Sequence, residues 1–453
     1  MSEPRISAAA RRGMERLAEH DPALFELLER EDERQAEVLA MVAASSVADG
    51  TVLACKATST TNVTGEGYPG ARFHAGCEVV DDIERLAIER AKAAFGAEYA
   101  NVQPHSGTSA NGVVIFGLLR PGDTLLGMDL DAGGHLTHGS KASVVGQYFN
   151  AVGYGVREDG LLDYDEVQRL ARQHRPKLII CGTSAYPRVV DFARFRAIAD
   201  DVGAALLADV SHVSGLIAGG AHPSPVDHAH FTTTSTYKQL YGPRGGLILS
   251  GRDANHALPG RDVTPAELVQ RGVFPFFQGT PDLSAIAAKA RALAIVATPE
   301  FAALAGRIVE TAAALARSLS GRGYPLVTGG TETHMVLVNV DPMGLTGLTA
   351  ERALGSCNIV VNKNRLPGDR HSAFVTSGIR FGTNSLALRG LSPGDMGECA
   401  ELIDTVLRAV VPQGERKFTL ADDVRDAVRA RVAEICDRHP IPDAPVTERR
   451  SAT

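Results

Sequence analysis

The 453-residue sequence lacks the features that mark membrane, secreted or nucleic-acid-binding proteins. It contains no long uncharged apolar run, and its charged N-terminal region has neither the apolar stretch nor the cleavage site of a secretory signal. Its six cysteines form no CxxC pair, which indicates free thiols in a reducing compartment. The net charge of −7 argues against a surface that binds polyanions. We therefore expect a cytoplasmic protein that inserts into no membrane and binds no nucleic acid.

The length of the chain predicts more than one hydrophobic core, because single cores stop growing at about 250–300 residues. Its 44% hydrophobic and 22% charged residues are typical of a globular protein. We predict an N-terminal helical arm over residues 1–60, a large domain over 61–297 and a smaller C-terminal α/β domain over 298–453. The end of the chain after Pro442 is expected to be frayed.

Short apolar runs alternate with amphipathic helical patterns from about residue 81 onward. Both faces of these runs look buried, which predicts an α/β fold with a large, doubly wound and mostly parallel sheet. Functional sites in such sheets lie at the carboxyl ends of the strands. The runs that predict this sheet cover residues 123–130, 177–182, 204–209, 229–234 and 245–250. A helical stretch at 299–323 and strand-like runs at 334–341 and 358–364 follow, and they predict the smaller domain.

Two neighbouring predicted strands end in groups that could serve one cofactor. The strand at 204–209 ends with Asp209, and His212 follows it, although an acid in this place can equally be a helix cap. The next strand leads through a hydroxyl-rich loop to Lys238, which by itself could be a surface residue. Together, the acid and the amine suit a pyridine cofactor that needs a carboxylate at its ring nitrogen and an amine for its aldehyde.

A third segment could hold a phosphate group. A short predicted strand at 100–103 is followed by Ser106, Gly107 and Thr108, and then by an apolar helix at 112–119. Small and hydroxyl residues at the start of a helix can offer backbone N–H groups and side-chain donors to an anion. The same residues also make an ordinary helix cap, so the segment gains weight only from the other two.

Two further patterns are set aside. The GxGxxG pattern at residues 65–70 contains Pro69 and has no strand-to-helix frame, so we do not expect it to bind a dinucleotide. His135 and His138 resemble a pair of metal ligands, but no matching third ligand lies nearby in the sequence. We therefore expect no metal site, and we expect these histidines to contact a cofactor or to be structural.

Together, these segments resemble the serine hydroxymethyltransferase family from about residue 40 to residue 440. The resemblance implies an aspartate-aminotransferase-like fold, pyridoxal 5'-phosphate as cofactor and an amino acid and tetrahydrofolate as substrates. It also implies a homodimer or a dimer of dimers, with active sites at the subunit interface. Six motifs in family order carry it: EGYPG at 66–70, NVQPHSG at 101–107, GGHLTHG at 133–139, GPRGG at 242–246, VNKN at 361–364 and TSGIR at 376–380.

The resemblance also implies a role for each matching position. Lys238 resembles the Schiff-base lysine, Asp209 the partner of the pyridine nitrogen, and His135 the imidazole stacked on the ring. Glu66 resembles the acid–base carboxylate beside the transferred one-carbon unit, and Arg380 resembles the arginine that binds the amino-acid carboxylate. The other matching positions are Ser106, Gly107 and Thr108 for the phosphate, Ser184 and His212 near the phenolic oxygen, and Leu130, Gly134, Leu136 and Asn364 for folate.

The sequence departs from the usual family pattern around this one pocket. We interpret the departures as a change of substrate, because replacing a tyrosine ring by threonine leaves space near the α-carbon for a methyl group. The family's α-methylserine branch, which uses D-alanine as acceptor, fits this interpretation. The departures are Thr64 and His74 in place of two tyrosines, Tyr237 in place of a histidine, Thr280 in place of a phosphate-binding glycine of the neighbouring subunit, Phe276-Phe277 in place of two glycines, and Ala43-Ala44-Ser45-Ser46 in place of Ala-Ser-Glu-Asn.

Three functions stay open at this point. The first is hydroxymethyl transfer to glycine or to an α-methyl acceptor. The second is folate-independent aldol or transaldol chemistry on threonine-like β-hydroxy amino acids. The third, a non-enzymatic homologue, is disfavoured because Lys238, Asp209, Arg380 and Glu66 are all present.

Overall fold

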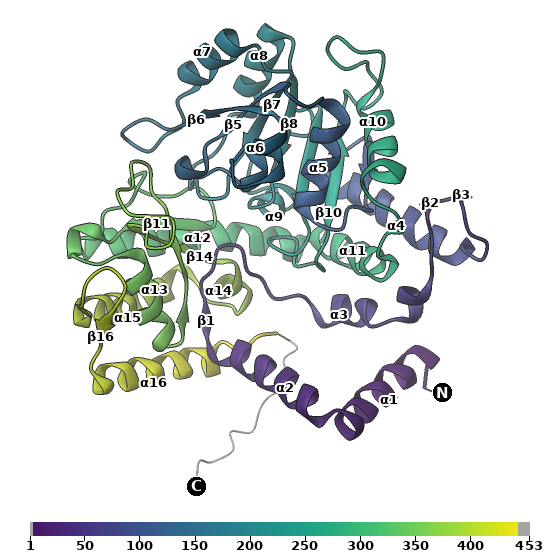
Figure 1. Ribbon diagram of the computed structural model, residues 1–453. Helices are drawn as coiled ribbons and strands as arrows, with labels where there is room; N and C mark the ends of the chain where they lie inside the picture. The colour runs from purple at the N-terminus through teal and green to yellow at the C-terminus, as the bar shows by residue number, and fades with distance from the viewer. Residues whose placement is uncertain (1–2, 443–453) are drawn as a thin grey trace.

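The computed structural model describes residues 3–442, so the predicted frayed end lies outside the described residues. Two helices, α1 (Arg5–His20) and α2 (Pro22–Glu37), form the start of the N-terminal arm, and neither has a buried residue. Figure 1 shows both helices below the body of the molecule, with α2 beside α16 (Asp422–Arg438). The chain then runs through β1 (Leu39–Ala40) and α3 (Gly50–Lys56) into the large sheet region.

The centre of the molecule is a seven-stranded sheet with the strand order β4-β10-β9-β8-β7-β5-β6. The pairs β5–β6, β5–β7, β7–β8 and β8–β9 are parallel, and only β10 runs antiparallel to its two neighbours. The predicted α/β fold with a mostly parallel sheet is therefore confirmed. The strands are β4 (Tyr99–Asn101), β5 (Thr124–Met128), β6 (Asn150–Tyr154), β7 (Leu178–Gly182), β8 (Ala205–Asp209), β9 (Phe231–Ser235) and β10 (Gly246–Ser250).

The five apolar runs of the sequence form β5, β7, β8, β9 and β10 to within two residues at each end. The sequence did not reveal β6, which lies at the edge of the sheet. Four of its five residues are exposed or half-buried, so it lacks the continuous apolar run that marks the inner strands.

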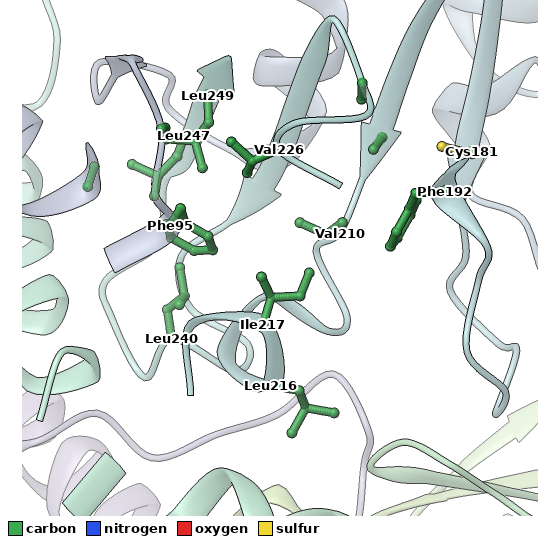
Figure 2. Close-up of a cluster of buried hydrophobic side chains, with 14 of the residues drawn as sticks. Phe95, Cys181, Phe192, Val210, Leu216, Ile217, Val226, Leu240, Leu247 and Leu249 are labelled. Atoms are coloured by element: carbon green, nitrogen blue, oxygen red, sulfur yellow. The ribbon is translucent and has the colours of Figure 1, made fainter. Parts of the chain in front are cut away.

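Helices cover both faces of this sheet, and successive strand residues point to opposite sides. In β10, Leu247 and Leu249 pack into one apolar cluster and Ile248 packs into another. Figure 2 shows part of the first cluster, where Phe95 and Ile217 meet the side chains of the sheet. The helices of the large domain are α4 (Glu78–Phe95), α5 (Gly107–Leu118), α6 (Val144–Tyr148), α7 (Tyr164–His174), α8 (Phe192–Val202), α9 (Ser214–Ala218), α10 (Pro265–Arg271) and α11 (Leu283–Val296).

A second, smaller layer follows along the chain. The antiparallel sheet β11-β14-β13 packs with its helices around a separate apolar cluster. Helix α12 contributes to both clusters, through Ile308 to the first and Leu315 to the second, and the domain boundary at 297/298 stays a prediction. The elements are α12 (Pro299–Gly321), β11 (Met335–Asn339), α13 (Gly347–Ser356), β12 (Ile359–Val360), β13 (Asn362–Asn364), β14 (Gly378–Gly382), α14 (Asn384–Leu388), α15 (Met396–Ala409), β15 (Val411–Pro412) and β16 (Phe418–Thr419).

The predicted single strand at 358–364 is wrong in one respect, because the structure divides it. Ile359 in β12 pairs with Leu39 of β1, whereas Asn362 in β13 pairs with Arg380 of β14. The two halves therefore belong to different sheets. A run of apolar and polar residues in sequence does not show which partner each half will find.

The structure also bears on two expectations from composition. All six cysteines are free thiols. Within residues 3–442, no single helix combines the length and apolar composition of a membrane span. Only α11 and α12 taken together have them, and these two helices meet at 79°.

Arg389, directly after α14, connects both ends of the described chain to the small domain. Its buried guanidinium donates to the carbonyl oxygens of Gln35 and Ala36 at 2.9 and 2.7 Å, and to that of His439 at 2.9 Å. We expect Arg389→Met to lower the free energy of unfolding by about 1–3 kcal/mol, because it leaves partly buried carbonyl groups without donors. Denaturant unfolding measures this difference. Arg169→Met, which removes an exposed ion pair with Glu166 and an exposed hydrogen bond to Gln173, is the control and should unfold like the unchanged protein.

Candidate active site

The site forms where β8 and β9 end side by side in the large sheet. In this parallel pair, Asp209 lies opposite Thr233, and the chain continues from β9 to Lys238. Asp209 is 6% and Lys238 7% exposed, so both ionisable groups are taken out of water. Burial lowers the pKa of Lys238 to about 8, although the nearby charge of Asp209 acts in the opposite direction. Roughly a tenth of this amine is therefore unprotonated at pH 7, far more than for an ordinary lysine.

Asp209 is buried but surrounded by hydrogen-bond donors. Its Oδ2 accepts from Asn111 Nδ2 at 2.7 Å, and its Oδ1 accepts from the backbone N–H and the hydroxyl of Ser211 at 3.1 and 2.6 Å. Burial raises the pKa of Asp209, but hydrogen bonds from His138 and Ser211 and the nearby imidazoles outweigh burial and hold the pKa well below its usual value. The carboxylate therefore stays ionised, as a partner for a protonated ring nitrogen requires.

His138 connects Asp209 to the turn that carries His135. The backbone N–H of His135 donates to His138 Nδ1 at 3.2 Å, which leaves the proton of His138 on Nε2, 3.2 Å from Asp209 Oδ2. His135 Nδ1 lies 2.8 Å from Thr137 Oγ1, and burial lowers the pKa of His135 to about 4. The imidazole of His135 is thus neutral at pH 7, as suits a ring that stacks on a cofactor.

The expectation that no third ligand lies near His135 and His138 is wrong, because the folded chain supplies one. The tertiary fold brings Asp209 to them, so that one ligand atom of each lies within 4.8 Å of the others. Asp209 is distant in sequence and approaches only because β8 ends below the turn. The expectation that the site holds no metal stays a prediction. The bonds from His135 N–H to His138 Nδ1 and between His138 Nε2 and Asp209 explain why the three residues are together.

The predicted phosphate segment is the first turn of α5. The helix begins at Gly107, five residues before the predicted start, and the Ser106 hydroxyl caps it by accepting from Ser109 N–H at 3.0 Å. A Cβ on Gly107 would lie 3.2 Å from Ser235 Cβ and 3.3 Å from Ser211 Oγ, so a larger residue would crowd both serines. The N–H groups of residues 107 and 108 have no partner within the helix, and Gly107 lies beside Ser211 and Ser235, next to the ends of β8 and β9.

Pyridoxal phosphate fits this arrangement because buried polar side-chain atoms around it have no hydrogen-bond partner. Within the described residues, Ser235 Oγ and His212 Nδ1 are buried and form no hydrogen bond. Ser235 faces Gly107 at the start of α5, where a phosphate would be bound. His212 stacks on His334 with ring centres 5.9 Å apart, and burial keeps its pKa well below the usual value. Unpaired buried polar atoms are costly unless a ligand satisfies them, which supports a polar cofactor in this space.

Arg380 reaches the same space from the small domain. It lies on β14, is 8% exposed, and donates through Nη1 to Ser184 O and through Nε to Asn362 Oδ1 at 3.1 Å. Burial lowers the pKa of Arg380 to about 10. Between residues 3 and 442, no carboxylate lies within ion-pair distance of it. A buried guanidinium without a carboxylate partner is suited to bind the carboxylate of an amino acid.

Two of the four predicted folate positions are exposed, whereas Gly134 is buried and Asn364 is half-buried. Leu130 in η2 (Leu130–Ala132) and Leu136 in η3 (Leu136–His138) are 40% and 45% exposed. Gly134 lies between them against the Met128 carbonyl, where a Cβ would collide. Asn364 belongs to another domain, but an ion pair of 2.8 Å between Arg365 and Asp131 brings its loop to η2. Two apolar side chains beside a polar one make a surface for a flat, partly polar ring.

Four predicted site residues lie outside the cluster of Lys238, Asp209 and Arg380. Glu66 has its Oε1 beside Gly279, Thr64 and His74 are exposed, and the Thr280 carbonyl lies 3.2 Å from His105 Nε2. As far as the described chain goes, none of them forms a hydrogen bond with Lys238, Asp209 or Arg380. The hairpin of β2 (Gly67–Tyr68) and β3 (Ala71–Arg72) that follows Glu66 projects from the far side of the molecule from β14 (Figure 1).

The unusual aromatic residues have two different surroundings. The Tyr237 ring lies against Arg244, whose guanidinium carbon is 3.8 Å from the ring centre, and 6.0 Å from the Lys238 amine. Phe277 packs on Gly112 of α5, where any side chain would collide with it. Phe276 is 57% exposed in η4 (Gly272–Phe277). Tyr237 is therefore a wall of the site, whereas the phenylalanine pair lies on the outer side of α5.

Sequence reasoning missed several residues of the site. Asn111, Thr137 and Ser211 hold Asp209 and His135 in place, and Ser235 faces the phosphate turn. Each is a small polar residue in or next to a segment singled out as a candidate site, which is the only signal that the sequence offered. Their partners are distant in sequence, so this signal did not show what they bind.

Known proteins are similar to this chain over most of its length. A family model described as serine hydroxymethyltransferase matches residues 17–403, which include every site residue discussed above. A serine hydroxymethyltransferase of Chromohalobacter salexigens is 47% identical over 425 residues, covering 94% of this chain and 98% of its own length. Those of Rhizorhabdus wittichii and Xanthomonas campestris pv. campestris are 46% and 47% identical over 426 residues, covering 94% of this chain and 94% and 98% of their own lengths.

The lowered pKa of Lys238 leads to a testable pH dependence. Only the unprotonated amine attacks an aldehyde, so attachment of pyridoxal phosphate to the cofactor-free protein should speed up from pH 6, with a midpoint at about pH 8, and level off roughly one pH unit higher. In Asp209→Asn, the charge that favours the ammonium form is gone, and the midpoint should move to lower pH. Stopped-flow absorbance measures both rates. A midpoint near 10.5, the ordinary value for lysine, would contradict this account.

Proposed function

The chain belongs to the serine hydroxymethyltransferase family, and we propose that it moves a hydroxymethyl group between tetrahydrofolate and a β-hydroxy amino acid whose α-carbon can carry a methyl group. The family uses pyridoxal phosphate as cofactor and tetrahydrofolate as co-substrate, and its reaction interconverts serine and glycine. The α-methyl substrates, α-methylserine and D-alanine, are the specific part of this proposal. The observation that carries it is the short Thr64 side chain beside Glu66.

The buried charges of the site support the cofactor chemistry. When bound, pyridoxal phosphate supplies an electron sink for the bond that breaks at the amino acid's α-carbon. Asp209 stays ionised and is in place to hold a proton on a pyridine nitrogen. Lys238 offers an amine that is partly unprotonated near pH 7, and the first turn of α5 with Ser235 offers donors to the phosphate.

Arg380 supports the amino-acid substrate. Its guanidinium is held by Ser184 O and Asn362, so its remaining N–H groups point in a fixed direction. Two parallel hydrogen bonds to a carboxylate would orient the α-carbon and decide which of its bonds is broken. Orientation of this kind contributes up to about 7–11 kcal/mol to the lowering of a reaction barrier.

The position of Glu66 supports a homodimer as the active unit, which two such dimers can extend to a tetramer. Within one chain, Glu66, Thr64, His74 and Thr280 lie away from Lys238, although the family resemblance gives all of them roles at the cofactor. A second copy of the chain can bring these residues to the site. The complete site would then combine the cofactor residues of one protomer with Glu66 of its partner. We further propose a cytoplasmic location, because all six cysteines are free.

The choice of substrate follows from Thr64 in this proposal. A threonine fills less space than the tyrosine usual in the family, so a pocket that includes it has room for an additional methyl group on the α-carbon. His74, in place of a second tyrosine, and Tyr237, in place of a histidine, change the polar groups of the same pocket. Because the two usual tyrosines are absent at positions 64 and 74, the folate-independent aldolase is the second candidate function.

Three amino acids, each tested with and without tetrahydrofolate, separate the candidates. D-Alanine released from α-methyl-L-serine only with folate supports the proposal, and glycine released from L-serine only with folate supports the ordinary reaction of the family. Aldehyde released from L-threonine at the same rate with and without folate supports the aldolase. No turnover of any of them, together with no covalent attachment of pyridoxal phosphate, would indicate a non-enzymatic homologue.

A single substitution tests the role of Thr64. In Thr64→Tyr, the preference for α-methyl-L-serine over L-serine, measured as the ratio of the two kcat/KM values, should fall by about 10–200-fold, because one methyl group is worth about 1–3 kcal/mol in a close-fitting pocket. Thr61→Tyr makes the same change at an exposed position of η1 (Ser59–Asn62) and should leave the ratio unchanged. An unchanged ratio in Thr64→Tyr would show that this residue does not select the substrate.

Mixing inactive variants tests the shared site. Lys238→Ala and Glu66→Gln are each expected to be inactive. When they are unfolded and refolded together, half of the dimers are mixed and each mixed dimer has one intact site, so about a quarter of the original activity should return. A mixture of Lys238→Ala with Asp209→Asn should stay inactive. One protomer supplies both Lys238 and Asp209 to each site, so no mixed dimer has an intact site. If neither mixture regains activity, Glu66 and Lys238 of the same protomer act in one site.

A further inference from the structure

Lys289 is a buried cation that none of the chemistry above uses. It lies on α11, is 2% exposed, and its Nζ donates to the carbonyl oxygens of Val102, Pro104 and Gly246 at 2.6, 3.0 and 3.1 Å. These bonds account for all three N–H groups of an ammonium ion. Within residues 3–442, no carboxylate lies within ion-pair distance of Lys289.

A buried ammonium surrounded by carbonyl oxygens is costly to maintain. Burial lowers the pKa of Lys289 to about 7, because no carboxylate in contact offsets the loss of hydration. Such a group destabilises the protein compared with an apolar side chain of the same size. Its presence therefore calls for a function that a methionine or leucine in α11 would not perform.

The three carbonyl groups belong to the backbone that carries the phosphate turn. Val102 and Pro104 lie between β4 and the Ser106 cap of α5, and Gly246 begins β10. Gly246 N–H also donates to Pro104 O at 2.9 Å. Lys289 thus ties the segment before α5 to the neighbouring strand through one charged group.

The packing around this group leaves little room for movement. A Cβ on Gly246 would collide with Ser106 O and lie 3.1 Å from Gly107 N, and a Cβ on Gly245 would collide with the Lys289 side chain. The backbone of β10 and the first residues of α5 are therefore in direct contact. A shift of Val102–Pro104 carbonyls would move the N–H groups at residues 107 and 108 with them.

We propose that Lys289 is a positioning residue for the cofactor phosphate: its ammonium group fixes the turn before α5 against β10 and adds a positive charge behind the phosphate-binding N–H groups. This inference rests on the cofactor site of the proposed function. It assigns Lys289 no contact with substrate or cofactor. Its effect is specific to the phosphate group, because the pyridine ring is held by Asp209, His135 and Lys238.

The test compares binding of pyridoxal 5'-phosphate with binding of pyridoxal, which lacks the phosphate. Equilibrium dialysis of the cofactor-free protein gives both dissociation constants without relying on activity. In Lys289→Met, binding of the phosphorylated form should weaken by about 10–100-fold, since bonds to a charged group are worth about 1.5–3 kcal/mol, whereas binding of pyridoxal should change less than threefold. Lys56→Met, which removes an exposed cation near the same helix, should change neither.

A second variant tests the charge itself, and it keeps the proposal testable if Lys289→Met folds poorly. In Lys289→Ala, the removed side chain leaves a carbonyl-lined space, and added methylammonium or ammonium ions should restore binding of pyridoxal phosphate, whereas tetramethylammonium, which has no N–H group, should not. Circular dichroism checks the fold of both variants. Equal weakening for both ligands, unchanged binding of the phosphorylated form, or no rescue by either cation would overturn the proposal. If the unchanged protein binds pyridoxal and pyridoxal phosphate equally well, the cofactor site itself is wrong, and the two failures are thereby distinguished.

Discussion

The ionised carboxylate of Asp209 is the interaction on which the arrangement of the site depends. It is removed from water, and four donors from Asn111, His138 and Ser211 replace its hydration. These donors come from α5, from the turn at η3 and from the end of β8. Keeping one buried charge satisfied therefore fixes three separate segments relative to one another. The residues that face the cofactor space lie on these same segments or directly beside them.

Two other buried ions, Arg380 and Lys289, have no carboxylate within ion-pair distance among the described residues. Arg380 and Lys289 both donate to backbone carbonyl or amide oxygens, and burial lowers the pKa of each. A protein selected for stability alone would replace such groups by apolar side chains. In this fold Arg380 donates to Ser184 O and Asn362 Oδ1, whereas Lys289 lies behind the segment that leads to α5. The free-energy cost of burying them is best explained by anionic ligands, a carboxylate at Arg380 and a phosphate near the start of α5.

The backbone on both sides of Glu66 is held by a separate buried network at the start of the β2–β3 hairpin. Arg72 forms ion pairs with Asp81 and Glu84 at 2.8 and 2.5 Å and donates to the carbonyl groups of Gly65 and Gly67, on either side of Glu66. Glu84 also accepts from Gln103, two residues after β4. The hairpin that follows Glu66 is thus rigidly attached to the segment between β4 and the first turn of α5. This rigidity makes sense if the hairpin serves the site of a second subunit.

By itself, the sequence determined the fold class, the inner strands of the sheet, and the residue types at two strand ends that suit a pyridine cofactor. It could do so because buried parallel strands are continuous apolar runs, and the chemistry of an acid and an amine is visible in their identity. Only the tertiary structure decided the start of α5, the edge strand β6, the division of 358–364 between two sheets, the third partner of His135 and His138, and the role open to Lys289. Each of these depends on contacts between segments that are distant along the chain, such as Asp209 with His138 or Lys289 with Val102. Local patterns of hydrophobicity and charge carry no information about which distant carbonyl or carboxylate a side chain will meet, because that depends on how the elements pack.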